Sequence, residues 1–366
     1  MRTVLISGAS VAGPALAYWL HHHDFAVTIV ERAPAPRPGG QAIDVRGVAL
    51  EVLERTGVLD QARAARTRMR GMSMVDGQGV ELWRSTEMAL SSGKLDSDDI
   101  ELLRDDLTRL LYAQTRDSTE YVFNDSITAL DETSKGVRVA FERGEPRTFD
   151  LVIGADGLHS TVRRLAFGPE ERFLRHLGTH LGVFSAKNFL DLDNWQVWFR
   201  DETTGGAIYP VRDNTELRVT LGFEAEPLDY DHRDVAQQKR IMTDRFAGSG
   251  WEIPRLIDAM NAAPDFYFDS MAQIHLDTWT TDRIALTGDA AYCASPLSGQ
   301  GTSLALAGAY VLADELSKNN DDALARYEER LRPFVHLNQA LATENPGMPP
   351  AEESLERAKN ALTLDE

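Results

Sequence analysis

The most restrictive feature of this sequence is its beginning, where two short apolar segments flank a turn of small residues and a helical pattern. Residues 3–7 and 26–30 have the composition of buried strands, and residues 11–22 between them have the spacing of a helix. The turn that joins the first strand to this helix reads GASVAG, residues 8–13. Strand, helix and strand in this order predict a βαβ unit and therefore an α/β fold.

The turn itself has the composition of a phosphate-binding loop. Gly8 and Gly13 would let the backbone approach a pyrophosphate, whose charge the N-terminus of a helix favours. Ser10 stands where the middle glycine of such loops usually lies, and its hydroxyl can donate to a phosphate. Glu31 ends the second strand, about 20 residues on, where an acid accepts hydrogen bonds from a ribose. The pattern predicts a dinucleotide site, and the alternative is an ordinary tight turn.

A second strand and turn lie in the middle of the chain. Residues 149–154 have a strand pattern that runs into Ala155-Asp156-Gly157, and Ser160 is placed to cap the helix that follows. This arrangement would put the Asp156 carboxylate at one edge of the same cofactor cleft. Taken alone, the segment could also be an unremarkable strand, turn and helix.

A third segment lies near the C-terminus. The strand pattern of residues 284–287 is followed by Asp289, by the loop 296–301 with sequence PLSGQG, and by a long apolar helix pattern. The carboxylate is suited to bind the hydroxyls of a polyol. The N–H groups at the helix start are suited to an electron-rich ring that becomes negative on reduction. Segments of these three kinds at the start, middle and end of one chain predict bound FAD.

In type and order, the three motifs resemble those of the group A FAD-dependent aromatic monooxygenases, the family of para-hydroxybenzoate hydroxylase. The resemblance covers about residues 2–335, and the compact size is similar to that of the tetracycline-inactivating branch. It implies an α/β fold with a Rossmann-like FAD-binding domain, an inserted β-sheet substrate domain and C-terminal helices. The implied FAD-binding domain comprises residues 1–70, 100–175 and 275–330, the substrate domain 71–99 and 176–274, and the C-terminal helical segment 331–366.

The resemblance also implies which residues contact the cofactors. The expected FAD contacts are Gly8, Ser10, Gly13, Glu31, Arg32, Asp44, Arg46, Arg104, Asp156, Asp289, Pro296, Gly299, Gln300, Gly301 and Thr302. Arg37 is expected to contact NAD(P)H, a reductant that binds without a Rossmann domain of its own. Ser10 and Tyr292 depart from the family pattern, because many members have glycine and histidine at these positions.

The reaction implied by the resemblance depends on the cofactor. NAD(P)H reduces FAD, O2 adds to flavin C4a, and the hydroperoxide transfers a hydroxyl group to an aromatic or polycyclic small molecule. Because this chemistry needs no nucleophilic side chain, we assign no catalytic acid or base and no metal site. Two alternatives remain open. One is a flavin-dependent dehydrogenase, epoxidase or cyclase of natural-product metabolism, and the other is a non-catalytic flavin-binding or ligand-binding protein.

The substrate is expected between the flavin and the middle of the chain, where residues 177–223 are rich in strand patterns and aromatic side chains. The expected contacts are Phe184, Trp198, Tyr209, Phe223 and Pro296. Each aromatic residue in this set could equally belong to the core of the sheet.

Composition excludes several other classes of function. The formal charge of −19, from 38 basic and 57 acidic side chains, disfavours binding to nucleic acid or to an anionic membrane. The single cysteine, Cys293, excludes an intrachain disulfide and any multi-thiolate metal site.

The three consecutive histidines at 21–23 are not expected to bind a metal. They point about 100° apart on a helix and cannot easily share an ion.

The sequence shows no targeting or membrane segment. Its first residues enter a strand pattern without the apolar run of a signal peptide. No stretch approaches the roughly 18 consecutive apolar residues of a membrane span. A cytoplasmic protein is therefore expected.

Overall fold

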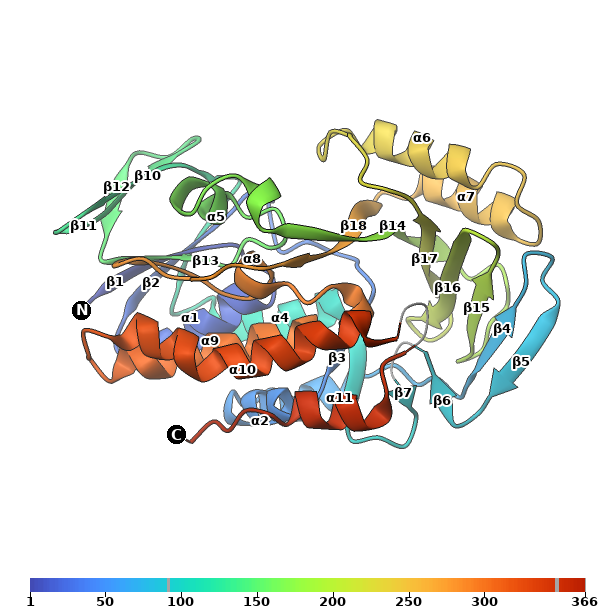
Figure 1. The fold of residues 1–366 in the computed structure, drawn as a ribbon, viewed down its shortest axis with the longest axis horizontal. Helices are drawn as coiled ribbons and strands as arrows, with labels where there is room; N and C mark the ends of the chain where they lie inside the picture. The colour runs from blue at the N-terminus through green and yellow to red at the C-terminus, as the bar shows by residue number, and fades with distance from the viewer. Residues whose placement is uncertain (91–92, 346–348, 366) are drawn as a thin grey trace.

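Two sheets at opposite ends of an elongated molecule dominate the computed structural model, which describes residues 1–90, 93–345 and 349–365 (Figure 1). A five-stranded sheet with its helices forms one end, and a seven-stranded sheet forms the other. The long strands β14 (Leu174–Lys187) and β18 (Tyr267–Ile274) run between the two ends. This is the α/β fold expected from the sequence.

The five-stranded sheet is parallel throughout and has the order β19-β13-β1-β2-β9. Its central strands are buried along nearly their whole length, as parallel strands covered on both faces are. The strands are β1 (Thr3–Ser7), β2 (Ala26–Glu31), β9 (Glu120–Phe123), β13 (Leu151–Gly154) and β19 (Ile284–Leu286).

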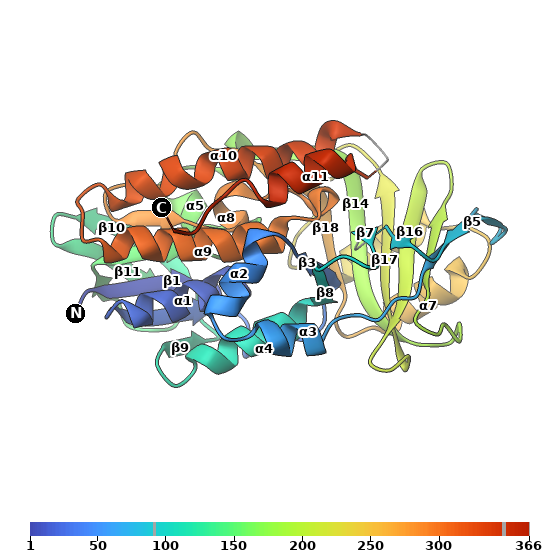
Figure 2. The ribbon, with the colours of Figure 1, turned by 90° about the horizontal axis from the view of Figure 1, so that it is seen from below.

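Long helices cover this sheet, and Figure 2 shows α9 and α10 lying beside it. Helix α1 packs against α9, which in turn packs against α10. The larger helices of this end are α1 (Ala12–His22), α4 (Arg104–Thr115), α9 (Gly301–Ser317) and α10 (Ala323–Glu344). The smaller ones are α2 (Val48–Arg55), α3 (Leu59–Ala64), α5 (Thr161–Ala166), α8 (Asp289–Tyr292) and α11 (Glu352–Lys359).

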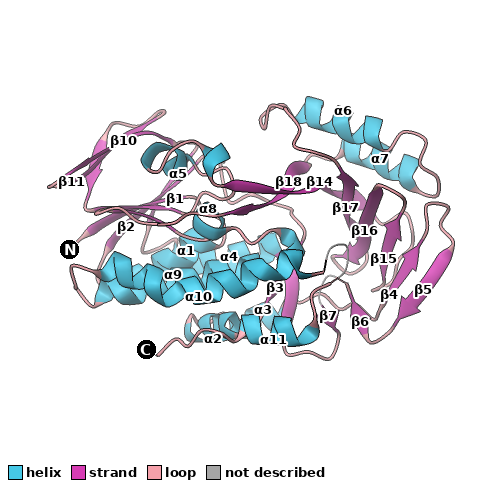
Figure 3. Ribbon diagram, in the orientation of Figure 1, coloured by secondary structure: helices cyan, strands magenta, loops and turns pink. Residues whose placement is uncertain are grey.

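The seven-stranded sheet has the order β18-β14-β17-β16-β15-β4-β5, and all its pairs are antiparallel except that of β4 with β15. Helices α6 (Val235–Arg245) and α7 (Ile253–Ala262) cover one of its faces, as Figure 3 shows. The other strands are β4 (Met72–Val75), β5 (Glu81–Ser85), β15 (Gln196–Arg200), β16 (Thr204–Val211) and β17 (Glu216–Glu224).

Short strands complete the fold, and Figure 1 shows β10, β11 and β12 at the outer edge of the end that holds the parallel sheet. Strand β3 pairs with β8, and β10, β11 and β12 form an antiparallel sheet of their own. The short strands are β3 (Ala42–Val45), β6 (Met88–Ala89), β7 (Gly93–Lys94), β8 (Ile100–Leu103), β10 (Ile127–Thr133), β11 (Gly136–Phe141) and β12 (Arg147–Phe149). Two 3-10 turns lie at Glu170–Arg172 and Pro296–Ser298.

Some expected boundaries differ from the structure. The apolar pattern of residues 48–59 belongs to two helices, because α2 ends at Arg55 and Gly57 then takes a φ of 77° before α3. The expected domain boundary between residues 330 and 331 falls inside α10. Helices α6 and α7 were not predicted. Among the described residues, no helix combines the length and the apolar character needed to cross a bilayer.

Candidate functional site

The three sequence motifs follow three neighbouring strands of the parallel sheet. In the strand pairing, Ser7 lies opposite Gly154, and Gly154 lies opposite Leu286. The glycine turn, the Asp156 segment and the Asp289 segment therefore begin side by side at the carboxyl edge of the sheet. This edge is where α/β folds of this type bind their ligands.

The glycine turn is packed so closely that larger residues are excluded at both of its ends. A Cβ atom on Gly8 would lie 2.4 Å from the carbonyl oxygen of Ala155, and Gly8 has a φ of 109°. A Cβ on Gly13 would lie 2.0 Å from the carbonyl oxygen of Gly8. Helix α1 begins here without a side-chain cap and without an acidic residue in its first turn. Its first N–H groups are thus available to an anion.

Glu31 fixes this turn to the end of β2. The Glu31 carboxylate accepts hydrogen bonds from the backbone N–H groups of Ala9 and Ala33, each at 2.9 Å. The Glu31 side chain is buried beside the turn, while the neighbouring Arg32 is exposed. A ribose contact of Glu31 stays a prediction.

Asp289 lies next to the glycine turn. A Cβ on the preceding Gly288 would be 3.2 Å from the Cβ of Ala12, the first residue of α1. Asp289 is exposed although Gly288 and Ala290 beside it are buried, and burial nevertheless raises the pKa of its carboxyl. A side chain that is surrounded by protein and still open to solvent lies in a cleft. The sequence interpretation requires this juxtaposition of Asp289 and the glycine turn.

The loop before α9 has a polar group that fits a ligand. Gln300 is fully buried, and within the described residues neither its amide nitrogen nor its amide oxygen has a hydrogen-bond partner. Leaving such a buried group unpaired costs about 1–3 kcal/mol. Helix α9 begins at Gly301 with no side-chain cap and no acidic residue in its first turn. The residues present therefore fit the polar edge of a flavin.

An ion pair lies against this loop. Arg46 is buried, and its guanidinium lies 2.9 Å from the Asp44 carboxylate. The backbone N–H of Arg46 donates to the Ser303 hydroxyl in α9 at 3.0 Å. A Cβ on Gly299 would lie 3.7 Å from both charged groups. Burial raises the pKa of Asp44 to about 7, and the attraction of Arg46 opposes this shift.

Arg104 joins the glycine turn to the neighbouring loop. It begins α4 and donates to the carbonyl oxygen of Gly39 at 3.1 Å and to the Ser10 hydroxyl at 3.4 Å. Burial lowers the pKa of Arg104, and the charge of exposed Arg37 lowers it further. The structure thus brings Ser10, Arg37 and Arg104 together.

Asp156 has a structural role that the sequence did not reveal. Its carboxylate accepts from the hydroxyls of Ser7 and Ser160 and from the N–H groups of Thr161 and Val162. Both oxygens are therefore engaged in holding the start of α5. Ser160 caps α5 as expected, because its hydroxyl accepts from the N–H of Arg163 at 2.9 Å.

Tyr292 points into the core. Its hydroxyl lies 3.0 Å from that of Thr287 and 3.1 Å from that of Tyr327, and the ring is 1% exposed. A Cβ on Gly308 would overlap the Tyr292 hydroxyl, so this residue of α9 must be small. The departure from histidine at position 292 is thus accommodated by packing beneath α9.

The expected substrate residues divide between two faces of the seven-stranded sheet. Phe184 and Phe223 belong to the core between the sheet and helices α6 and α7, so the structure corrects their expected place in the pocket. Tyr209 is buried on the other face, where its hydroxyl accepts from the N–H of Ala42 at 2.7 Å. Trp198 is half-buried, and Pro296 is exposed.

Arg218 is a residue of this region that the sequence did not suggest. Successive residues of a strand point to opposite faces, and Arg218 lies between Leu217 and Val219 of the helix-facing core. Arg218 donates to the carbonyl oxygen of Gly40 at 3.0 Å and to the Ser185 hydroxyl at 2.5 Å. The signal in the sequence is an arginine between the apolar residues Leu217 and Val219 of a strand pattern.

Comparisons with known proteins bear on the family and the fold of this chain. The family described as FAD binding domain matches residues 1–340. An uncharacterized protein of Mycobacterium tuberculosis strain H37Rv is 53% identical and covers 100% of this chain and 99% of its own length. A flavin-dependent monooxygenase of Legionella longbeachae is 39% identical over 92% of this chain and 86% of its own length. The crystal structure of tetracycline destructase Tet(55) matches with a TM-score of 0.88 and 37% identity, covering 100% of this chain and 99% of that one.

Proposed function

Because this chain belongs to the FAD-binding-domain family of flavin-dependent monooxygenases, we propose that it uses NAD(P)H and O2 to hydroxylate an aromatic or polycyclic small molecule. The observation that carries the proposal is the cleft at the carboxyl edge of the parallel sheet. There Asp289 is open to solvent beside the glycine turn, and α1 and α9 both begin without caps.

The residues of this cleft would hold FAD in one orientation. The turn from Gly8 to Gly13 and the start of α1 would bind the pyrophosphate, and Asp289 would accept from the ribityl hydroxyls. Gln300 and the first N–H groups of α9 would donate to the pyrimidine edge of the flavin. When bound, FAD supplies the activation of O2 and the transfer of one oxygen atom. Helix α9 would stabilise the negative charge that the reduced ring carries.

NAD(P)H would approach near Arg37. Arg37 is exposed, and it lies close enough to Arg104 for the two charges to interact. In a chain with a net charge of −19, such a local positive region attracts the phosphates of a dinucleotide. We further propose a cytoplasmic location, since NAD(P)H is supplied there.

The substrate would be a flat ligand placed between the flavin and the sheet. Trp198, on the sheet face opposite α6 and α7, and exposed Pro296, in the loop before α9, remain open for such a contact. The similarity to tetracycline destructase Tet(55) supports polycyclic compounds, including tetracyclines, as the first class to test.

The experiment is a substrate screen on the purified protein. Bound FAD is confirmed by its absorption, and aromatic compounds and tetracyclines are tested for stimulated NAD(P)H oxidation. The proposal expects stimulation together with a product heavier by one oxygen atom. Conversion of a substrate without oxygen incorporation would instead indicate a dehydrogenase or cyclase. FAD binding with no compound-stimulated oxidation would contradict the proposed reaction.

A further inference from the structure

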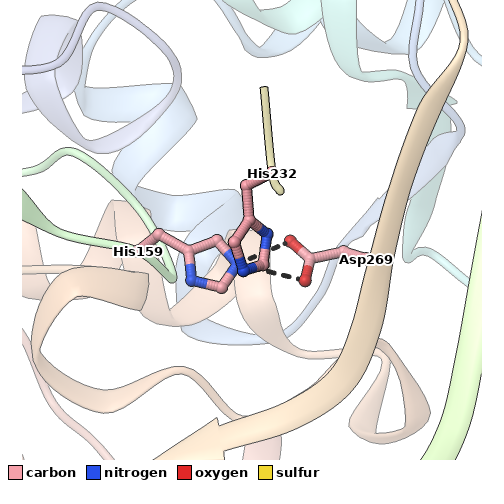
Figure 4. Close-up of side chains that lie close together, drawn as sticks. All are labelled: His159, His232 and Asp269. Atoms are coloured by element: carbon pink, nitrogen blue, oxygen red, sulfur yellow. Dashed lines mark hydrogen bonds and ion pairs between the residues drawn. The ribbon is translucent and has the colours of Figure 1, made fainter. Parts of the chain in front are cut away.

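Three side chains of the kind that bind transition metals meet in one cluster, and none of them is among the residues expected to contact FAD (Figure 4). His159 lies in the loop between β13 and α5, His232 lies before α6, and Asp269 lies on β18. One ligand atom of each lies within 4.8 Å of those of the others. We propose that His159, His232 and Asp269 form a binding site for a divalent transition metal ion, with Zn²⁺ as the best-fitting ion.

The spacing of these atoms suits a tetrahedral ion. His159 Nε2 lies 3.1 Å from each carboxylate oxygen of Asp269. Two ligands at about 2.1 Å from Zn²⁺ lie about 3.4 Å apart in tetrahedral geometry. Small side-chain rotations would therefore complete the coordination of all three groups. Imidazole nitrogen and carboxylate oxygen are ligands that Zn²⁺ prefers.

The surrounding residues orient the ligands as they do in metal sites. His159 Nδ1 lies 2.8 Å from Glu170 Oε1, which leaves Nε2 directed at Asp269. Arg163 in turn holds Glu170 at 2.6 Å, and the Tyr267 hydroxyl donates to Asp269 at 2.6 Å. A histidine whose second nitrogen donates to a carboxylate is the usual arrangement of a metal ligand.

His232 closes the cluster from the solvent side. It is exposed, and its ring centroid lies 4.1 Å from that of His159. Because β18 belongs to the seven-stranded sheet and His159 follows a strand of the parallel sheet, a bound ion would link the two ends of the molecule. Three protein ligands would leave one position for water. This site departs from the sequence expectation of no metal.

The test is a calorimetric titration of the metal-free holoprotein with ZnCl2 at pH 7. We expect one site, and His232→Ala should weaken its affinity at least tenfold because one ligand is lost. Glu170→Gln should weaken the affinity for Zn²⁺ about tenfold to a hundredfold, because Glu170 orients the His159 ring. The matched control is His23→Ala, at the exposed end of α1, which should leave the affinity unchanged.

Retained FAD content and circular dichroism establish that the His232→Ala protein is folded, and His232 is suited to this test because it is exposed. The absence of Zn²⁺ binding, or equal affinity in wild type and His232→Ala, would overturn the proposal. A loss of binding in His23→Ala instead would also overturn it, because the ion would then occupy the histidine tract at 21–23.

Discussion

Asp289 illustrates how one residue combines two environments. Its neighbours are buried and its own pKa is raised by burial, yet its side chain reaches solvent beside the start of α1. The neighbouring Cys293 thiol opposes the effect of burial on the pKa of this carboxyl. Tyr292, three residues later, turns into the core instead and supports α9. Neighbouring positions of one short helix thus serve the cleft and the core separately.

Replacing Asp289 by Asn should weaken FAD binding about tenfold to a hundredfold. The substitution keeps the shape but removes the charge that strengthens hydrogen bonds from hydroxyl groups, worth about 1.5–3 kcal/mol. Titration of the apoprotein with FAD, followed by flavin fluorescence, measures the change. Asp282→Asn, an exposed residue before β19, is the control. Unchanged affinity in Asp289→Asn would contradict the proposed ribityl contact.

The helices and strands of this fold are held in place by close backbone contacts and by apolar layers. The turn between β1 and α1 tolerates only glycine at two positions, and three parallel strands align their ends so that the motifs meet. In the other sheet, alternate residues of β17 face helices α6 and α7 and form a core with aromatic side chains. His180 of β14 lies within this aromatic group, stacked on Phe223 and Phe268.

The Gly13→Ala substitution should destabilise the βαβ unit. The new methyl group would lie 2.0 Å from the carbonyl oxygen of Gly8, so the backbone of the turn must move. We expect the free energy of unfolding, measured in urea, to fall by about 1–3 kcal/mol. Gly222→Ala is the control, because its methyl group would meet the nearest atom at 3.4 Å. A stable Gly13→Ala protein with normal FAD content would show that the turn is looser than described.

His180 should make the protein sensitive to acid. Burial lowers the pKa of His180 to about 4, so between about pH 6.5 and 4 the unfolded chain binds a proton that the folded protein does not. Stability is therefore lost as the pH falls through this window. When the pH is lowered from 7 to 5, the free energy of unfolding should fall in both proteins. The fall should be about 2 kcal/mol smaller in His180→Phe than in the wild type.

Urea unfolding of both proteins at pH 7 and pH 5 measures this difference, with His21→Phe, an exposed residue of α1, as the control. Phenylalanine suits position 180 because two aromatic rings already stack there. Equal pH dependence in His180→Phe and wild type would mean that His180 titrates normally in the folded protein.

At the scale of the whole molecule, several polar contacts join the seven-stranded sheet to the cofactor end, and two of them reach the start of β3. The Tyr209 hydroxyl accepts from the N–H of Ala42, and Arg218 donates to the carbonyl oxygen of Gly40. Both contacts hold the loop that precedes and begins β3, and this strand leads to Asp44 and Arg46. The sheet thereby fixes the position of the strand that leads to the Asp44–Arg46 ion pair.

Tyr209→Phe should loosen this connection. The change leaves the N–H of Ala42 without its acceptor in a partly buried position, which costs about 1–3 kcal/mol. We expect a lower free energy of unfolding and faster amide hydrogen exchange in β3, measured by mass spectrometry. Tyr18→Phe on α1 serves as the control. Unaltered exchange in β3 would show that the contact does not hold the loop.

The sequence by itself determined what depends on neighbouring residues. The strand, glycine turn and helix at the N-terminus, the Ser160 cap and the α9 start are local patterns, and their order indicated the family. Helix α6 escaped prediction because it is mainly polar and its buried Met242 gains its environment only from the sheet. A local pattern contains no information on which distant strands will cover a helix.

Only the tertiary structure decided which groups face which surroundings. Phe184 and Trp198 have the same aromatic character in the sequence, but strand register placed Phe184 in the helix-facing core. The packing of α5 engaged both oxygens of Asp156. His159 and Asp269, separated by 110 residues in sequence, meet because β18 crosses from one sheet to the other end of the molecule. Contacts between distant segments depend on how whole elements pack, and no short stretch of sequence specifies that.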